Sequence, residues 1–171
     1  MTGKKKRLRH RLIFFPLYLL MPLDDFRAQV TTLVDLELLG HCADRYGVSL
    51  TAVVLKWIQY TEENAVLDLS RDGYMQWSFS SRQAARDGAF FRTRKQTVAV
   101  PAGSIALAPG VKHERRGIEV PAKVWFPHAD AGMSVREMKV SSDQFDYVLS
   151  LLNLPRSASV WRPSETERHG W

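Results

Sequence analysis

The sequence predicts an α+β protein in which an N-terminal helical segment is followed by a mixed, mainly antiparallel α+β domain. Up to about Thr61, apolar residues recur every three or four positions, as they do along one face of a helix. Beyond Thr61 the period is mostly two, which is typical of strands with one buried face. We therefore divide the chain into an N-terminal arm (1–17), a helical segment (18–61), an α+β domain (62–155) and a flexible tail (156–171).

The first helix of the helical segment is expected to start near a pair of aspartates. Either Asp24 or Asp25 can cap it, because a short carboxylate accepts hydrogen bonds from the free amides of a first turn. The apolar face of this helix would then run through Phe26, Val30 and Leu33.

Two further helices are predicted on either side of Gly47. A helix over 35–46 should end there, because glycine adopts the left-handed C-cap conformation without a steric penalty. Ser49 should cap the next helix, over 50–60. The apolar neighbours of Trp57 in that helix predict that its ring is buried in a core.

The clearest strand pair is a hairpin formed by 65–69 and 74–79. Arg71-Asp72-Gly73 would close it, since Asp-Gly favours the tight turns that join antiparallel strands. Further along, we predict in order a turn at 101–104, a short helix at 105–108, strands at 123–126 and 135–140, and a helix or strand at 145–154.

The helical segment also has the spacing of a helix-turn-helix. A small residue where two helices meet, a glycine turn and an aliphatic residue on the second helix occur in the pattern Ala43-x3-Gly47-Val48-Ser49-x3-Val53. A helix that reads DNA should expose Arg, Lys, Asn or Gln to base edges. This one offers chiefly Thr51, Lys56 and Gln59. We therefore interpret the helix pair as a packing scaffold and keep DNA binding as the alternative.

Basic residues gather in the N-terminal arm. The formal net charge is +6, and six arm residues account for it, because the other 18 of the 24 basic residues balance the 18 acidic ones. A run of like charges stays solvated, so the arm is the candidate contact for polyanions such as DNA. Its basic residues are Lys4, Lys5, Lys6, Arg7, Arg9 and Arg11.

An apolar run from Leu12 to Leu23 follows these charges and has the outline of a secretory signal. Pro16 and Pro22 interrupt the run, which is too short to span a bilayer and is followed by no small-residue cleavage site. The single cysteine suits a reducing compartment. We expect a cytoplasmic protein without a membrane span, with export or membrane tethering through residues 1–23 as the alternative.

The motif of hydrolytic zinc enzymes is missing. H-E-x-x-H places two imidazoles one helical turn apart, so that both reach the same ion. His113-Glu114 begins this motif, but Gly117 stands where the second histidine is required. We therefore predict that His113 is a loop residue, and we assign no catalytic and no metal-binding residue. Neither a G-x-S-x-G elbow nor a glycine-rich phosphate loop occurs, so an enzyme of another type has no support from the residues.

Aromatic residues concentrate around the predicted hairpin. Core packing is one interpretation of them. The alternative is a ligand pocket, because such pockets are lined by aromatic side chains with a few polar groups. The candidate pocket residues are Trp57, Tyr74, Trp77 and Phe79.

Several segments together resemble the ImmA/IrrE family of zinc metallopeptidases. Leu19-Leu20-Met21-Pro22 resembles the "LLMP" stretch that follows the zinc-binding helices of that family. The segment 39–57 resembles the family's helical pair, and the segments 70–77, 101–104 and 135–152 resemble the downstream strands of its longer members.

This resemblance implies a helix-turn-helix followed by a GAF-like, sensor-type domain. Family members carry H-E-x-x-H upstream of the "LLMP" stretch, whereas the seventeen residues before Tyr18 contain no acidic residue. We therefore expect a truncated, catalytically inactive fragment that retains the regulatory part, with no cofactor of its own and with zinc only in full-length members. The alternative is a transcriptional regulatory module that binds DNA, a protein or a small-molecule ligand.

Overall fold

The computed structural model describes residues 20–30 and 33–156, and it has the α+β composition that the sequence predicts. The chain divides into two compact units, Met1–Lys56 and Trp57–Trp171. The division between these units falls inside helix α4 (Leu50–Tyr60), and the domain boundary after Thr61 stays a prediction. The basic arm residues from Lys4 to Arg11 and the tail from residue 157 onward lie outside the described residues.

Helix α3 (Leu36–Tyr46) confirms the predicted C-cap at Gly47, whereas Asp35, predicted as its first residue, is its N-cap. The Asp35 side chain accepts a hydrogen bond from the Leu38 amide at 2.8 Å. At the other end Gly47 adopts φ +62°, the left-handed conformation that glycine allows. The buried face of α3 comprises Leu36, Leu39, Cys42 and Ala43.

Helix α2 (Leu23–Gln29) begins earlier and ends earlier than predicted. Asp24 and Asp25 lie in its first turn, and Pro22 is the N-cap, so the predicted carboxylate cap is wrong. Proline is suited to this end because its missing amide hydrogen needs no partner there. The Asp24 and Asp25 carboxylates still lie near the positive end of the helix dipole. Leu33, predicted on the apolar face of this helix, lies beyond its end with 74% of its surface exposed.

An aspartate on α2 instead connects this helix to α3. The Asp25 carboxylate accepts a short hydrogen bond from the Tyr46 hydroxyl and lies 3.5 Å from the Arg45 guanidinium. The rings of Phe26 and Tyr46 meet edge to face, with centroids 6.2 Å apart. This pairing explains why Asp25 does not serve as a cap.

Helix α4 follows a short turn and confirms two predictions. The Ser49 hydroxyl accepts a hydrogen bond from the Ala52 amide at 3.2 Å. Trp57 is buried, with 2% of its surface exposed. Lys56 is equally inaccessible, at 2%, although its polarity had suggested an exposed position. Among the described residues, no helix has the length and apolar character needed to cross a membrane.

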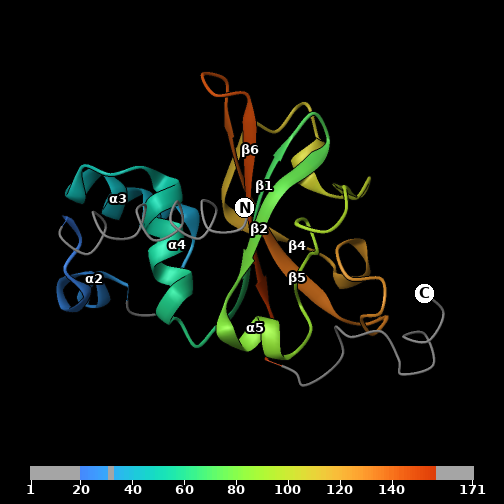
Figure 1. Cartoon of the computed structure of the whole chain (residues 1–171), viewed down its shortest axis with the longest axis horizontal. Coiled ribbons are helices and arrows are strands. Elements are labelled where there is room, and N and C mark those ends of the chain that lie inside the picture. Colours follow the sequence, from blue (N-terminus) through green and yellow to red (C-terminus); the bar gives the residue numbers. More distant parts are fainter. Residues whose placement is uncertain (1–19, 31–32, 157–171) are drawn as a thin grey trace, which may run out of the picture. The chain divides into compact units, whose positions relative to one another are not determined.

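Within the described ranges, six strands form one sheet in the order β3-β2-β1-β6-β5-β4. Every described pairing is antiparallel, whereas the sequence had suggested a mixed sheet. The first and last strands pair at its centre, where β1, in green, runs beside β6, in red (Figure 1). The strands are β1 (Asn64–Arg71), β2 (Tyr74–Ser80), β3 (Val98–Ala99), β4 (His113–Pro121), β5 (Ser134–Ser142) and β6 (Tyr147–Leu154).

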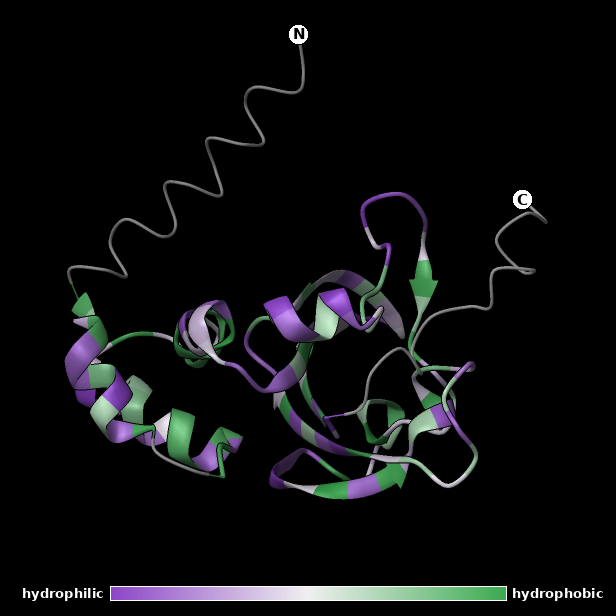
Figure 2. Cartoon of the chain, turned by 90° about the horizontal axis from the view of Figure 1, so that it is seen from below, coloured by the Kyte–Doolittle hydropathy of each residue, from purple (hydrophilic) through white to green (hydrophobic). Residues whose placement is uncertain are grey.

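The predicted hairpin is confirmed as β1 and β2. Asp72 and Gly73 both adopt positive φ, at 52° and 77°, as the tight turn between twisted strands requires. Polar and apolar residues alternate along β2 from Met75 to Ser80, and purple and green bands are visible along the sheet in Figure 2. The segment 145–154, left open as a helix or a strand, contains β6.

Two connections bring small and aromatic side chains to one face of the sheet. The connection from β2 to β4 contains α5 (Arg82–Arg86), β3 and the 3-10 helix η1 (Ile105–Leu107); the one from β4 to β5 contains the 3-10 helix η2 (Ala122–Val124). Their residues form a buried cluster with strand residues such as Val66 and Leu152. We call the face that carries Val66 and Leu152 the covered face. The connections contribute Ala84, Ala89, Val100, Ala106, Ala122, Trp125, Phe126 and Ala129 to this cluster.

Two predicted elements around β4 are wrong. The segment 123–126 is no strand, because it overlaps η2, and Trp125 and Phe126 are both buried although a strand would direct them to opposite faces. His113 is no loop residue but the first residue of β4. The sequence did not indicate β4 because it is an edge strand with mostly exposed residues and an interrupted register.

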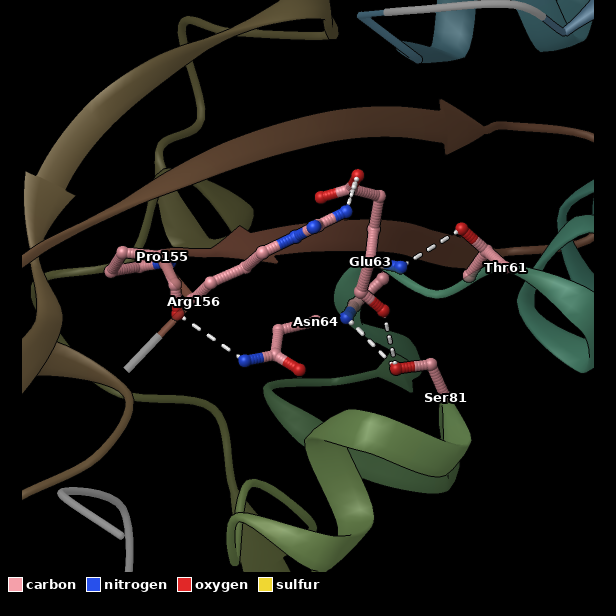
Figure 3. A network of polar contacts seen from close by, with 7 residues as sticks. Thr61, Glu63, Asn64, Ser81, Pro155 and Arg156 are labelled. Atoms are coloured by element: carbon pink, nitrogen blue, oxygen red, sulfur yellow. Dashed lines mark hydrogen bonds and ion pairs between the residues drawn. The ribbon is translucent and has the colours of Figure 1, made fainter. Parts of the chain in front are cut away.

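A polar network fastens the ends of β1 and β6 next to α5 (Figure 3). The Ser81 hydroxyl donates to the Glu63 carbonyl oxygen at 2.7 Å and accepts from the Ala65 amide at 3.2 Å. The Asn64 side-chain amide donates to the Pro155 carbonyl oxygen at 3.3 Å, and Arg156 pairs with the Glu63 carboxylate at 2.7 Å. These bonds hold the central strands together where they begin and end.

Replacing Gly117 with alanine is expected to destabilise the protein by about 2 kcal/mol. This residue has φ +89°, and a Cβ atom there would lie 2.8 Å from Arg136 Cγ and 2.9 Å from Met138 Cγ. Both backbone strain and overpacking of this size cost about 1 to 3 kcal/mol. Urea denaturation would measure the loss. Gly110→Ala is the control, because nothing lies within 4 Å of its added Cβ; equal losses in both variants would contradict the prediction.

Candidate functional site

Polar side chains form a row across the covered face of the sheet. The strand register aligns Asp68 with Ser78 on one side and Ser150 on the other, Ser150 with Lys139, and Lys139 with Glu114. Directly paired residues of antiparallel strands share a face. We call Ser78, Asp68, Ser150, Lys139 and Glu114 the polar row.

The position of the polar row is unusual because its centre is buried. Val66 and Leu152 of the core cluster lie two residues from Asp68 and Ser150, so they share the same face. Asp68, Ser150 and Lys139 are 0%, 0% and 3% exposed. The covered face therefore combines an apolar cluster with a line of polar groups that water does not reach freely.

Asp68 is the residue of the polar row in which both side-chain oxygens lack a hydrogen bond within the described ranges. Neither of its carboxylate oxygens has a hydrogen-bond partner among the described residues. Burial raises the pKa of this carboxyl to about 7, and the nearby Ser70 hydroxyl offsets part of the rise. The Ser70 hydroxyl itself donates to the Val148 carbonyl oxygen at 3.5 Å. Asp68 thus presents two oxygens that can accept hydrogen bonds.

Ser150 lies beside Asp68 and also has a side-chain oxygen without a hydrogen bond among the described residues. Its hydroxyl is buried and has no hydrogen-bond partner within residues 20–30 and 33–156. On the other side of Asp68, the Ser78 hydroxyl donates to the Phe91 carbonyl oxygen at 3.3 Å. A buried polar atom without a partner costs about 1 to 3 kcal/mol, so the pair Asp68 and Ser150 needs an explanation beyond packing.

Lys139 supplies a cation at the far side of the row. Its ammonium donates to the Ala108 carbonyl oxygen at 2.9 Å. An ammonium has three donors, so this bond leaves two of them for other acceptors. Burial lowers the pKa of Lys139, and the neighbouring Glu137 carboxylate acts in the opposite direction.

Glu137, one row away on the same face, serves as a contrast to Asp68. Its carboxylate accepts hydrogen bonds from the Ser104 hydroxyl, from the Ala106 amide at 3.3 Å and from the Trp125 indole nitrogen at 3.0 Å. Each of these contacts joins the sheet to one of the two connections. Glu137 is therefore a structural anchor, whereas the described donor nearest to Asp68, the Ser70 hydroxyl, donates to the Val148 carbonyl oxygen.

The aromatic residues proposed from the sequence lie elsewhere. Trp77 and Phe79 pair with Leu69 and Leu67, on the face opposite the polar row, and Tyr74 shares that face because it pairs with Arg71. Trp57 belongs to α4. Tyr74 is half exposed, whereas Trp77 and Phe79 are partly buried. Their role as a ligand pocket stays a prediction.

Metal binding has no geometric basis in the described part of the chain. There, no group of three or more His, Cys, Asp or Glu residues is close enough to hold an ion.

No protein-family model matches the sequence, and no curated protein matches it significantly. The function must therefore be argued from the polar row itself.

Sequence reasoning did not find Asp68 or Lys139. Each is a polar residue in a strand that alternates with apolar neighbours, and such residues normally face water. The one sequence feature that bears on the burial of Asp68 and Lys139 is the set of small and apolar residues in the β2–β4 connection, and these residues follow neither a helix nor a strand period. Small residues there indicated a turn, not a segment that covers the sheet.

Proposed function

We propose that this chain is a regulatory module that binds a small molecule at the polar row. The observation that carries the proposal is Asp68, which is fully buried while both of its oxygens lack a partner among the described residues. Buried polar groups in native proteins are almost always satisfied. A ligand that donates hydrogen bonds to Asp68 and Ser150 would satisfy both residues at once.

The proposed module corresponds to the regulatory, sensor-type region of an ImmA/IrrE-type metallopeptidase-related protein. Support comes from the sequence segments that resemble that family and from the order of elements, a helical segment before an antiparallel sheet. We accordingly propose a helix-turn-helix-like α3–α4 pair and a GAF-like sheet unit. The sequence contains no H-E-x-x-H, so peptide hydrolysis and a zinc cofactor are not part of this proposal.

DNA binding has weaker support than ligand binding. A reading helix must present basic or amide side chains to the bases, but the single lysine of α4, Lys56, is 2% exposed, and its single amide side chain, Gln59, is partly buried. The proposal therefore assigns the α3–α4 pair a packing role and places recognition at the sheet.

A ligand screen against matched variants tests the proposed function. The wild type, Asp68→Asn and Asp72→Asn would be screened by thermal shift against a chemically diverse library of small metabolites. Asp72 is an exposed turn residue at φ +52°, a conformation that asparagine tolerates, so this variant controls for loss of one negative charge. We expect at least one compound to raise the midpoint of the wild type and of Asp72→Asn but not of Asp68→Asn. A library without any such compound would contradict the proposal.

A further inference from the structure

Positive charge gathers in one continuous segment of the sheet unit, 82–97. This segment contains five basic residues and one acidic residue, Asp87, so its net charge is +4 (5 − 1). Without it and the N-terminal arm, the chain has 13 basic residues (24 − 6 − 5) and 17 acidic ones (18 − 1). The balanced charge outside the arm is therefore the sum of a positive segment and a negative remainder. We call 82–97 the basic segment; its basic residues are Arg82, Arg86, Arg92, Arg94 and Lys95, and all five are exposed.

The basic segment runs back alongside β2. It begins with α5, which follows the end of β2 (Figure 1). Farther along, the Phe91 carbonyl oxygen accepts a hydrogen bond from the Ser78 hydroxyl at 3.3 Å, and Val98, which follows the segment, pairs with Met75. The distance along β2 from Ser80 to Met75 is about 17 Å, at about 3.3 Å per residue. The basic side chains are therefore distributed beside β2 over about this length.

Buried contacts fix the backbone of the basic segment. Ala84 and Ala89 belong to the core cluster, and the Ala89 amide donates to the Ala84 carbonyl oxygen at 2.8 Å. Phe91 packs against the same cluster. In the turn that follows, the Lys95 amide donates to the Arg92 carbonyl oxygen at 2.9 Å. A surface whose backbone is already fixed loses less conformational entropy when it binds a partner.

Carboxylates of the described residues do not compensate the charges of the basic segment. Arg82 and Arg86 lie one turn apart on α5, where like charges repel. Asp87 accepts instead from the side-chain amides of Gln83, at 3.0 Å, and Asn64, at 3.2 Å. Such repulsion opposes folding and is compensated when an anion binds. Within residues 20–30 and 33–156, four of the five basic residues form no ion pair: Arg82, Arg86, Arg92 and Lys95.

We propose that the basic segment binds a single-stranded nucleic acid, with its arginine and lysine side chains on the phosphates and the Phe90 ring stacked on a base. The Phe90 side chain is 44% exposed in the middle of this segment. Single-strand binding without sequence preference combines a positive surface along the backbone with aromatic side chains on which bases stack. This surface does not include the polar row, so the inference does not rest on the proposed function.

Two other anionic partners fit the basic segment less well. The major groove of duplex DNA admits a helix, but α5, the one helix of the segment, has only five residues. A lipid surface takes up a helix with a continuous apolar face beside its basic residues. Phe90 is the single exposed large apolar side chain of the segment. One ring among several cations suits a stacked base better than a bilayer.

Fluorescence anisotropy of labelled oligonucleotides with the intact chain tests the proposal. Oligo(dT) and oligo(rU) of about twelve nucleotides match the site sizes of single-strand binding proteins. For at least one of them, Arg92→Gln/Lys95→Gln should weaken binding about tenfold or more. The salt slope should fall by about 1.4, since each phosphate contact to a single strand contributes about 0.7.

Lys112→Gln/Arg115→Gln is the matched control. It removes the same two types of charge from the region of β4, which forms the other edge of the sheet from β3. Both residues are exposed, so the change should alter binding by about threefold or less. Thermal midpoints establish first that each variant is folded.

Two variants of Phe90 test the stacking contact. Phe90→Leu keeps an apolar side chain but removes the ring, so it should weaken oligonucleotide binding about fivefold or more. Phe90→Tyr keeps the ring and should bind as the wild type does. A role of Phe90 in packing alone would not distinguish the two variants in this way.

Several results would overturn the proposal. If the wild type binds no single strand, or binds a duplex of the same sequence length more tightly, the partner is wrong. If Arg92→Gln/Lys95→Gln and the matched control bind equally, the contact lies elsewhere, as in the N-terminal arm. If Phe90→Leu binds as the wild type does, the stacking contact is wrong. If Arg92→Gln/Lys95→Gln loses binding to vesicles of anionic lipid but keeps oligonucleotide binding, the segment contacts a lipid surface instead.

Discussion

Raising the pH from 4 to 8 is expected to destabilise the wild type by about 4 kcal/mol relative to its Asp68→Asn variant. Burial holds the pKa of Asp68 at about 7 in the folded protein, against an ordinary value of 3.8. Each unit of difference between folded and unfolded pKa corresponds to about 1.4 kcal/mol. The asparagine side chain cannot ionise, so the variant lacks this contribution.

The sign follows from which state binds the proton more tightly. Between pH 3.8 and about 7, folded Asp68 keeps a proton that the unfolded chain releases. Stability from this residue is therefore fully present below pH 3.8 and is lost progressively as the pH rises through 7. Above that range the contribution no longer changes.

Urea denaturation of both proteins at several pH values between 4 and 8 measures this difference. Other titrating groups are shared by the two proteins, so they cancel in the comparison. Asp72→Asn is again the control, because an exposed turn carboxylate should give a curve parallel to the wild type. If the Asp68→Asn curve also runs parallel to that of the wild type, Asp68 titrates normally. The proposal of ligand binding at the polar row would then lose its main physical support.

The fold could be predicted where local chemistry decides it. Gly47 and Ser49 mark helix ends because their backbone and side chain suit those positions, and Asp72-Gly73 closes a hairpin for the same kind of reason. Prediction failed where a distant contact decides the outcome. Asp25 has the chemistry of a cap, but the Tyr46 hydroxyl, twenty-one residues away, takes its carboxylate.

The candidate site could not be predicted because its burial depends on segments that have no periodic pattern. The β1 sequence gives Asp68 the position of a solvent-facing residue, whereas in the fold the two connections cover that face with residues such as Ala84 and Trp125. The strand register that aligns Asp68 with Ser150 is also a property of the folded sheet, since these residues are 82 positions apart (150 − 68). Sequence order carries no trace of such a pairing.

Asp68 and Glu137 are two carboxylates buried in this sheet in opposite ways. Glu137 accepts hydrogen bonds from both connections, whereas the Ser70 hydroxyl beside Asp68 donates to the Val148 carbonyl oxygen and leaves both Asp68 oxygens without a hydrogen bond among the described residues. A buried carboxylate without partners lowers stability, and residues of that kind are typical of functional sites, where stability and activity oppose each other. The proposed ligand would reverse this loss by mass action when it binds.

Replacing Glu137 with alanine is expected to destabilise the protein by about 3 to 5 kcal/mol. The change leaves the Trp125 indole N–H and the Ser104 hydroxyl without their acceptor and opens a cavity in a fully buried position. Glu137→Gln should cost less, about 1 to 3 kcal/mol, because the amide can accept at one end only and turns a donor toward either the indole or the hydroxyl. Urea denaturation of each variant measures these losses.

A double-mutant cycle with Trp125→Phe distinguishes the hydrogen bond from a general loss of packing. Phenylalanine keeps an aromatic ring but removes the indole N–H, so Glu137→Gln should cost about 1 to 2 kcal/mol less in that background than in the wild type. Glu119→Gln is the control: its carboxylate is exposed and accepts from the Ser134 hydroxyl at the sheet edge, so a change below about 0.5 kcal/mol is expected. Additive losses at Glu137 and Trp125 would refute the anchor, because residues that act through one shared bond must lose that bond only once.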